Sequence, residues 1–248
     1  MKPLVIFEKV VKKYGKVMAL NGLSFSLEET KYTALVGNNG CGKTTTVLVL
    51  CNLLQSQEGV VKYKGRVITP NYVSYKKELG IVLSEPYYIE EFTIEEYLKF
   101  VCKFQKVPTQ DINKRINDLL ALLNLREYKK EKIKNLSSGN QKKVSIAASL
   151  IHNPSFLIYD EPFLNLDMQT LHSIKSLLKS LKGTKTLLIT SHNLDLIADL
   201  CDEFLIMEKG KVIAQLSKSE FPTIEDLKNY VANHLVKDKV MNNIEWLY

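Results

Sequence analysis

Apolar and polar residues alternate along the first thirty or so positions, and this period of two predicts β-strands. Further along, short apolar runs predict buried strands, and two runs joined by Lys64 and Gly65 predict a hairpin. Strands are therefore expected at 4–10, 17–20, 23–27, 32–36, 60–63, 66–68, 79–83, 156–159, 185–190, 203–207 and 211–215.

Apolar residues spaced three or four apart predict helices in the remaining segments. Thr93 begins a helical stretch with a capping-box pattern, and Pro108 divides that stretch in two. Helices are expected at 43–54, within 93–128, from the end of 136–139 to about 151, at 168–181, at 194–200, and in the tail, where apolar residues stand at 221, 224, 227, 231 and 235 before Trp246. Alternating strands and helices predict a largely parallel sheet with both faces covered.

The composition is that of a globular protein of 248 residues, long enough for one large domain or two small ones. No apolar run approaches the ~18 residues of a membrane span, and the N-terminal apolar run is too short for a secretory signal. The four cysteines form no CxxC pair and are interpreted as free thiols of a reducing compartment. We therefore expect a cytoplasmic chain whose membrane contacts come through a partner.

The net charge of +7 raises the question of nucleic-acid binding. The lysines are spread along the chain in short clusters, and no basic helix interleaved with aromatic residues occurs. A solvated, lysine-rich surface is the favoured interpretation, and we expect no nucleic-acid partner. Basic patches also suit an anionic inner membrane leaflet.

Residues 37–44 match the phosphate-loop pattern G-x-x-x-x-G-K-[ST], after a predicted strand and at the start of a predicted helix. Glycines let successive backbone N–H groups turn inward toward phosphate oxygens, and the helix adds its positive dipole end. Lys43 is expected to reach the β and γ phosphates, and Thr44 to be a Mg²⁺ ligand. The expected ATP-binding residues here are Gly37, Asn38, Asn39, Gly40, Cys41, Gly42, Lys43, Thr44 and Thr45. Cys41 is also a candidate for inhibition by thiol reagents.

An apolar strand at 156–159 ends in two carboxylates, Asp160 and Glu161. In a chain with a phosphate loop, Asp160 is expected at the magnesium ion and Glu161 beside the attacking water. A kinase, a GTPase and a transporter ATPase all remain compatible with these two motifs.

Further motifs resemble those of the ATP-binding cassette (ABC) family, the ATPase subunits of ABC transporters. They are the signature-like run 136–140 (Leu-Ser-Ser-Gly-Asn) followed by Gln141, the run 161–167 from Glu161 to Asp167, the triplet Thr190-Ser191-His192, and the pair Tyr14-Gly15. The matches keep the family's order and spacing from about residue 4 to 215.

The resemblance implies a P-loop NTPase core, mainly a parallel sheet with flanking helices, with an N-terminal antiparallel β subdomain and a helical insertion. It implies an ATP-binding domain over 1–220, a helical subdomain at about 88–138 and a C-terminal helical tail over 221–248. Glu161 and His192 would be catalytic, and Tyr14 would stack on adenine. Ser137, Ser138 and Gly139 would bind the γ-phosphate of ATP held by a second subunit, so that two chains enclose two Mg-ATP.

Four positions depart from the family pattern. Ser138 replaces a signature glycine and Asn140 a glutamine, while Thr30 stands where a glycine is common. Ser84 aligns with the Q-loop glutamine that links magnesium to the helical insertion, and serine is too short for that reach. Our hypothesis is that Glu85 takes over this role.

The expected function is that of an ATPase subunit powering a separate integral membrane permease, on the inner face of the cell membrane. Export of a peptide, lipid or drug is favoured, with an importer as the alternative. A soluble ABC ATPase acting on ribosomes or DNA is the second alternative, which the single cassette without heptad repeats disfavours. The motifs leave open the cargo and whether the second ATP-binding subunit is identical or a close paralogue.

Overall fold

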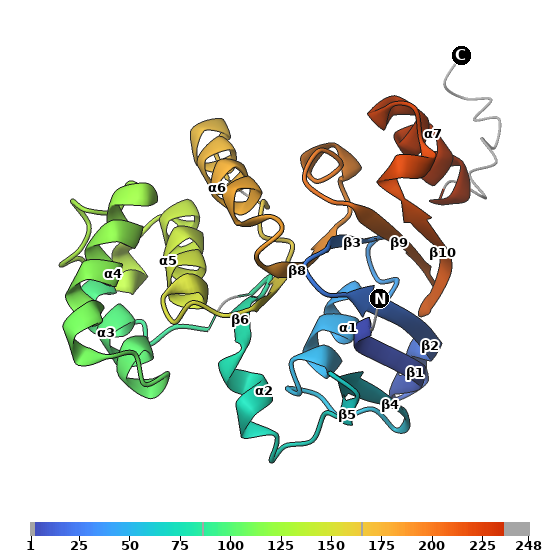
Figure 1. Ribbon diagram of the computed structural model, residues 1–248, viewed down its shortest axis with the longest axis horizontal. Helices are drawn as coiled ribbons and strands as arrows, with labels where there is room; N and C mark the ends of the chain where they lie inside the picture. Colours follow the sequence, from blue (N-terminus) through green and yellow to red (C-terminus); the bar gives the residue numbers. More distant parts are fainter. Residues whose placement is uncertain (1–2, 86, 165, 236–248) are drawn as a thin grey trace, which may run out of the picture.

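The computed structural model describes residues 3–85, 87–164 and 166–235, and it contains two sheets and a separate group of helices (Figure 1). The strands are β1 Pro3–Tyr14, β2 Val17–Glu28, β3 Tyr32–Val36, β4 Glu58–Tyr63, β5 Arg66–Val67, β6 Leu79–Val82, β7 Phe156–Asp160, β8 Thr186–Ser191, β9 Glu203–Glu208 and β10 Lys211–Ser217. The helices are α1 Lys43–Leu50, α2 Val73–Lys77, α3 Ile94–Phe104, α4 Thr109–Leu122, α5 Ser138–Leu150, α6 Met168–Leu181 and α7 Ile224–Leu235.

The central sheet has six strands in the order β10-β9-β3-β8-β7-β6. Neighbouring strands from β9 to β6 are parallel, and β10 pairs antiparallel at one edge. Every residue of β3, β7 and β8 is buried, as expected for parallel strands covered on both faces. The predicted mainly parallel core is confirmed, and the carboxyl ends of its central strands form the edge at which such sheets bind ligands.

The N-terminal sheet is antiparallel, in the order β2-β1-β4-β5, and confirms the predicted β subdomain and hairpin. The separate strands expected at 17–20 and 23–27 are one strand, β2. Its pairing with β1 shifts between Leu20 and Leu23, and Gly22 there has a φ of 67°. A bulge therefore absorbs the break in alternation that had suggested two strands.

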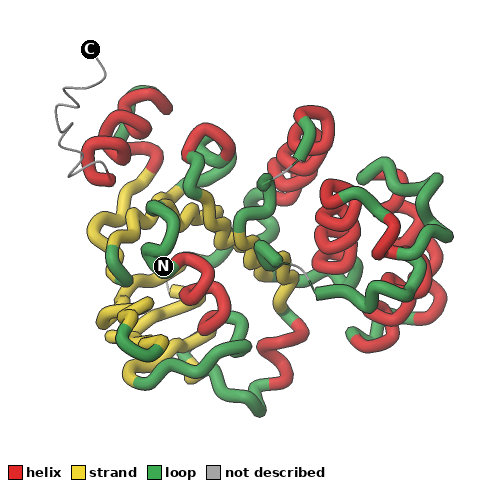
Figure 2. Tube along the Cα trace, turned by 180° about the vertical axis from the view of Figure 1, so that it is seen from behind, coloured by secondary structure: helices red, strands yellow, loops and turns green. Residues whose placement is uncertain are grey.

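Helices α3, α4 and α5 form a layer to one side of the sheets, and α5 is the helix of this layer that packs against β6 (Figure 2). Thr93 caps α3 with the predicted capping box, and Ile94, Leu98 and Cys102 of α3 are fully buried. Ile112 and Ile116 of α4 belong to the same apolar core cluster. An apolar stripe on each helix thus holds this layer together, as the helical periodicity predicted.

Two helical predictions were wrong in extent. The first helix ends at Leu50 rather than at 54, and Asn52 has a φ of 56°. In place of a helix over 194–200 there is only a 3-10 turn, Leu194–Leu196. Ile197 has a φ of −125°, outside the helical region, so the turn cannot continue as a helix.

The short helix α2 was not predicted, because its few residues offer too little periodicity. The predicted tail helix is present as α7, and its Leu227 and Val231 are buried in the main core. Residues 236–248, including Trp246, lie outside the described part of the chain. Among the described residues, no helix combines the length and hydrophobicity that a membrane span requires.

Candidate nucleotide-binding and hydrolysis site

The glycine-rich loop 37–44 joins the buried strand β3 to α1. Lys43 is the first residue of α1, and its side chain is buried. Its ammonium donates to the carbonyls of Gly37 at 2.8 Å and Asn38 at 3.3 Å, so the charge lies within the curl of the loop. The exposed loop residues are Asn38, Asn39, Gly40 and Thr44, whereas Gly37, Cys41, Gly42, Lys43 and Thr45 are buried or half-buried. The loop can therefore present backbone N–H groups and one cation to a phosphate chain.

Close packing explains two of the loop glycines. A Cβ on Gly37 would collide with the Met207 carbonyl, and one on Gly42 would collide with the Ala19 carbonyl of β2. Gly42 also has a φ of 113°, which side chains disfavour. The loop is thus held between β9 and β2.

The turn between β9 and β10 is bonded to the same loop. The Gly210 N–H donates to the Cys41 carbonyl at 2.9 Å, and the Gly210 carbonyl accepts from the Asn21 N–H at 2.9 Å. The phosphate loop, the β9–β10 turn and β2 therefore share one network of backbone hydrogen bonds.

Asp160 lies at the carboxyl end of β7 and is fully buried. Its Oδ1 accepts a hydrogen bond from the Thr190 hydroxyl at 2.5 Å. Its Oδ2 is buried without a hydrogen-bond partner among the described residues. Burying an unpaired carboxylate oxygen is costly, so this atom is suited to a cation or its water shell.

Glu161 follows in a left-handed backbone conformation with a φ of 45°, which is unusual for a residue with a side chain. Its N–H donates to the Thr190 hydroxyl at 3.0 Å. Its carboxylate Oε1 lies 3.0 Å from Nδ1 of His192 and 3.9 Å from Nζ of Lys43. Strained backbone of this kind clusters at functional sites. Here it places the Glu161 carboxylate near both Lys43 and His192, the histidine predicted to be catalytic.

The signature residues lie elsewhere, at the start of α5. Ser137 caps this helix by accepting from the Asn140 N–H at 3.3 Å. Ser137 and Ser138 are exposed and Gly139 is half-buried. Their backbone thus offers an open helix N-terminus, which favours anions. It stands on the helical layer and not at the phosphate loop of its own chain (Figure 1).

Tyr14 lies at the end of β1 with a ring that is 46% exposed. The Lys12 ammonium stands 5.7 Å from the ring centroid. This leaves a ring face available for stacking. No described contact links Tyr14 to the phosphate loop, so its role in binding adenine stays a prediction.

Thr190 was part of a recognised motif but had been given no role. Its hydroxyl bonds both Asp160 and the Glu161 backbone because β8 pairs in parallel with β7, with Thr190 opposite Asp160. No local pattern in the sequence signals this contact, because it depends on how β8 is aligned with β7.

Lys142 of α5 was also missed. Its buried ammonium donates to the carbonyls of Leu83 and Ser84, both at 3.2 Å. Burial lowers the pKa of Lys142, and the carboxylates of Asp160 and Glu161 oppose that shift. The signature helix is therefore tied to the end of β6, where the chain leaves the central sheet.

The four cysteines are free thiols, as predicted, and all are buried. Burial raises the pKa of Cys41, and the nearby Lys43 ammonium only partly offsets this. A buried, protonated thiol reacts slowly, which argues against ready modification of the loop.

A glycine loop between a strand and a helix, a buried lysine within it, and an aspartate–glutamate pair at the carboxyl end of another parallel strand of the same sheet define a P-loop NTPase. The sequence also matches the family model described as ABC transporter over residues 20–164.

Three relatives extend this match. The uncharacterized ABC transporter ATP-binding protein MJ1023 of Methanocaldococcus jannaschii is 35% identical over 214 residues, which are 86% of this chain and 77% of that protein. Nod factor export ATP-binding protein I of Ralstonia nicotianae is 32% identical over 90% of this chain and 70% of its own. The energy-coupling factor transporter ATP-binding protein EcfA1 of Lactococcus lactis is 30% identical over 99% of this chain and 93% of its own.

Solved structures agree on the fold. The dimeric ATP-binding cassette MJ0796 with bound ADP and Pi has a TM-score of 0.80 at 23% identity, over 86% of this chain and 98% of that chain. This chain belongs to the family of ABC transporter ATP-binding subunits, and it is an ATPase.

Proposed function

We propose that this chain closes as a dimer around two Mg-ATP and thereby powers a separate integral membrane permease. The observation that carries the proposal is the division of the site. Lys43, Asp160, Glu161 and His192 converge, while the anion-binding helix start at Ser137 is exposed on another layer. A second subunit, identical or a close paralogue, would supply the missing γ-phosphate contacts from its own Ser137, Ser138 and Gly139.

Magnesium fits the residues at this site. Asp160 offers a buried carboxylate oxygen without a partner among the described residues, and the Thr44 hydroxyl is exposed at the loop. Hard oxygen donors of this kind suit Mg²⁺. Asp160 and Thr44 would hold the ion, which when bound would neutralise phosphate charge.

Glu161 would act as general base toward the attacking water, since its carboxylate is half-enclosed between a lysine and a histidine. His192 would orient that carboxylate and donate a hydrogen bond to the γ-phosphate. Tyr14 would stack on the adenine ring.

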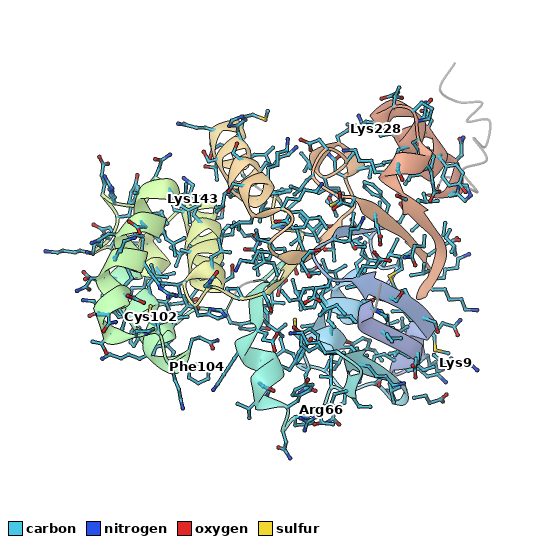
Figure 3. All side chains as sticks on the ribbon, viewed as in Figure 1. Lys9, Arg66, Cys102, Phe104, Lys143 and Lys228 are labelled. Atoms are coloured by element: carbon cyan, nitrogen blue, oxygen red, sulfur yellow. The ribbon has the colours of Figure 1, made fainter. Side chains whose placement is uncertain are left out.

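A groove of about 370 Å³ between the central sheet and the helical layer supports a membrane partner. Its lining is mainly apolar and comes from both parts of the molecule: Cys51, Leu53, Leu79, Ile81, Val82, Leu83, Tyr87, Tyr97, Val101 and Ala148, with His152 among the polar members. Leu53 and Tyr87 are 61% and 83% exposed, and Phe104 of α3 is exposed on the side of the helical layer toward α2 (Figure 3). Exposed apolar residues around a groove mark an interaction site.

The docking proposal predicts that Leu53→Asp disrupts the partner complex. A charge in the groove should lower recovery of a hydrophobic multi-span protein with this chain, from detergent-solubilised membranes of its source, by about 10-fold. The matched control is Ile213→Asp. Ile213 is 43% exposed and belongs to β10, a strand at the opposite side of the molecule from α3 (Figure 1). Recovery of ribosomes or DNA at physiological salt instead, unaffected by Leu53→Asp, would favour the alternative of a soluble ABC ATPase.

The groove histidine predicts a pH dependence of stability. His152 donates from Nε2 to the Leu79 carbonyl at 2.9 Å, its Nδ1 is buried without a partner among the described residues, and burial lowers its pKa. The neutral ring is therefore favoured in the folded state. The resulting stability is present above the unfolded-state pKa of about 6.5 and is lost as pH falls below it toward the folded-state pKa, by at most ~1.4 kcal/mol per pH unit.

Urea unfolding between pH 7 and 5.5 measures this effect. His152→Gln should flatten the pH slope, whereas His172→Gln, which changes an exposed histidine, should leave it as in the wild type. Equal slopes for wild type and His152→Gln would contradict the assignment.

Export of a peptide, lipid or drug is the proposed direction, on the inner face of the cell membrane. Relatives named for Nod factor export and for linearmycin resistance support it. The match to EcfA1 keeps an importer as the alternative. ATP-dependent uptake of candidate cargo into inside-out vesicles would distinguish export from import.

We also propose which ranges of the chain carry out each part of this function. We assign nucleotide binding to 1–220, partner contacts to the helical subdomain at about 88–138, and a helical tail to 221–248. Glu85 is exposed at the mouth of the helical insertion, a position compatible with the linking role proposed for it in place of Ser84.

A further inference from the structure

The buried end of β8 carries a hydroxyl that contacts both carboxylate residues of the site. Thr190 is fully buried, and its Oγ1 lies 2.5 Å from Oδ1 of Asp160 and 3.0 Å from the backbone nitrogen of Glu161. The parallel register of β7 and β8 sets Thr190 opposite Asp160. The two strands thereby fix the position of the hydroxyl.

The direction of these two bonds follows from the chemistry of the groups. A threonine hydroxyl has one proton and two acceptor lone pairs. The backbone N–H of Glu161 can only donate, so the hydroxyl accepts from it and gives its own proton to Asp160. Oδ1 of Asp160 is thus engaged, and Oδ2 is the oxygen left for a cation.

The end of β8 and the residue after it contact Glu161 at two points. Thr190 accepts from the Glu161 backbone, and His192, which directly follows β8, bonds the Glu161 carboxylate at 3.0 Å. Glu161 needs such support because its φ of 45° is strained for a residue with a side chain.

We propose that Thr190 is a positioning residue for ATP hydrolysis. It fixes the Asp160 carboxylate so that Oδ2 faces the cation site, and it stabilises the left-handed backbone that aims the Glu161 carboxylate. This rests on the proposed roles of Asp160 and Glu161. Thr190 itself touches neither substrate nor water in this scheme.

The test compares Thr190→Val, which removes the hydroxyl at nearly constant volume, with Thr190→Ser, which keeps it. Thr186→Val is a closely matched control on the same strand. The Thr186 hydroxyl also accepts a backbone N–H, that of Thr30 at 2.8 Å, and Thr30 likewise has a left-handed φ of 60°. Thr186 is buried as well, but it lies at the opposite end of β8 from the site.

We expect kcat for ATP hydrolysis to fall by about 10- to 100-fold in Thr190→Val, with a change in KM for ATP below about 3-fold. Thr190→Ser should recover to within a few-fold of the wild type. Thr186→Val should lose a similar amount of melting temperature to Thr190→Val while keeping its kcat.

Equilibrium binding supplies a readout besides activity. The affinity for a fluorescent ATP analogue is measured once with Mg²⁺ and once with EDTA. In Thr190→Val the gain in affinity on adding Mg²⁺ should shrink by about 3- to 10-fold, because Asp160 can turn away. In Thr190→Ser and Thr186→Val that gain should be retained.

Wild-type kcat in Thr190→Val, equal losses in the valine and serine variants, or an equal loss of kcat in Thr186→Val would each overturn the proposal. Glu161→Gln, measured in parallel, separates this from failure of the proposed function. If Glu161→Gln is inactive while Thr190→Val is fully active, only the role of Thr190 fails. If Glu161→Gln hydrolyses ATP at the wild-type rate, the assignment of Glu161 fails, and the role of Thr190 fails with it.

Discussion

Replacement of Glu161 by glutamine is expected to lower kcat for ATP hydrolysis by about 10²- to 10³-fold. The amide keeps the size of the side chain and a contact with His192, but it cannot accept a proton from water. Lys43 and Asp160 remain in place, so Mg-ATP should still bind with an affinity within a few-fold of the wild type. Bound ATP that is not hydrolysed should hold two chains together. Steady-state ATPase assays and light scattering with Mg-ATP measure the two effects.

The control for this variant is Glu8→Gln. Glu8 forms an ion pair with Lys62 at 2.7 Å in the antiparallel sheet, so this change removes another carboxylate that is paired with a cation, but away from the site. It should hydrolyse ATP normally and dimerise only transiently. A Glu161→Gln chain that stays monomeric with Mg-ATP and hydrolyses it at the wild-type rate would refute the proposed role of Glu161.

The second large effect is expected on binding rather than on turnover. Lys43→Met should weaken ATP binding by at least about 100-fold, because charge-assisted hydrogen bonds contribute about 1.5–3 kcal/mol each and the methionine can make none. The Lys43 ammonium is buried among carbonyls of the phosphate loop. A lysine or arginine at the surface therefore cannot easily replace it as the cation that binds phosphate. Titration with a fluorescent ATP analogue measures the loss.

Lys64→Met is the matched control for that experiment. Lys64 bonds Glu78 at 2.6 Å at the surface of the β4–β5 hairpin, so its loss tests for a general effect of removing one positive charge. Its affinity for ATP should equal that of the wild type. Similar binding by wild type and Lys43→Met would contradict the assignment of the loop as the phosphate site.

Much of this site could be predicted because its chemistry is encoded locally. The glycine loop, Lys43, and the pair Asp160–Glu161 lie within short segments whose order of strand, loop and helix is itself a local pattern. The structure brings Lys43, Glu161 and His192 together. Even the departure at Thr30 has a structural counterpart, since its φ of 60° is the conformation that a glycine would adopt without strain.

Thr190 and Lys142 could not be assigned roles in this way. The contact between Thr190 and Asp160 depends on the register of two strands whose residues are 30 positions apart in sequence. In the sequence, nothing distinguishes Lys142 from the many lysines expected at the surface. In the structure, packing buries its side chain against the end of β6. The helix expected at 194–200 failed for a related reason. Ile197, Ala198 and Leu200 are buried there without a regular helical backbone, so their apolar spacing reflects tertiary contacts.

The backbone bonds of Gly210 have a mechanical consequence. They connect the phosphate loop to the β9–β10 turn and to β2, so a shift of any one of these segments would have to break or strain its bonds to the others. The helical layer is joined to the central sheet differently, by an apolar core that both share and by the junction where the chain leaves β6. The Lys142 ammonium donates hydrogen bonds to the carbonyls of Leu83 and Ser84 at that junction. The phosphate loop is thus fastened to its neighbours by directional backbone bonds, whereas the signature helix is joined to the sheet by the Lys142 ammonium and by apolar packing.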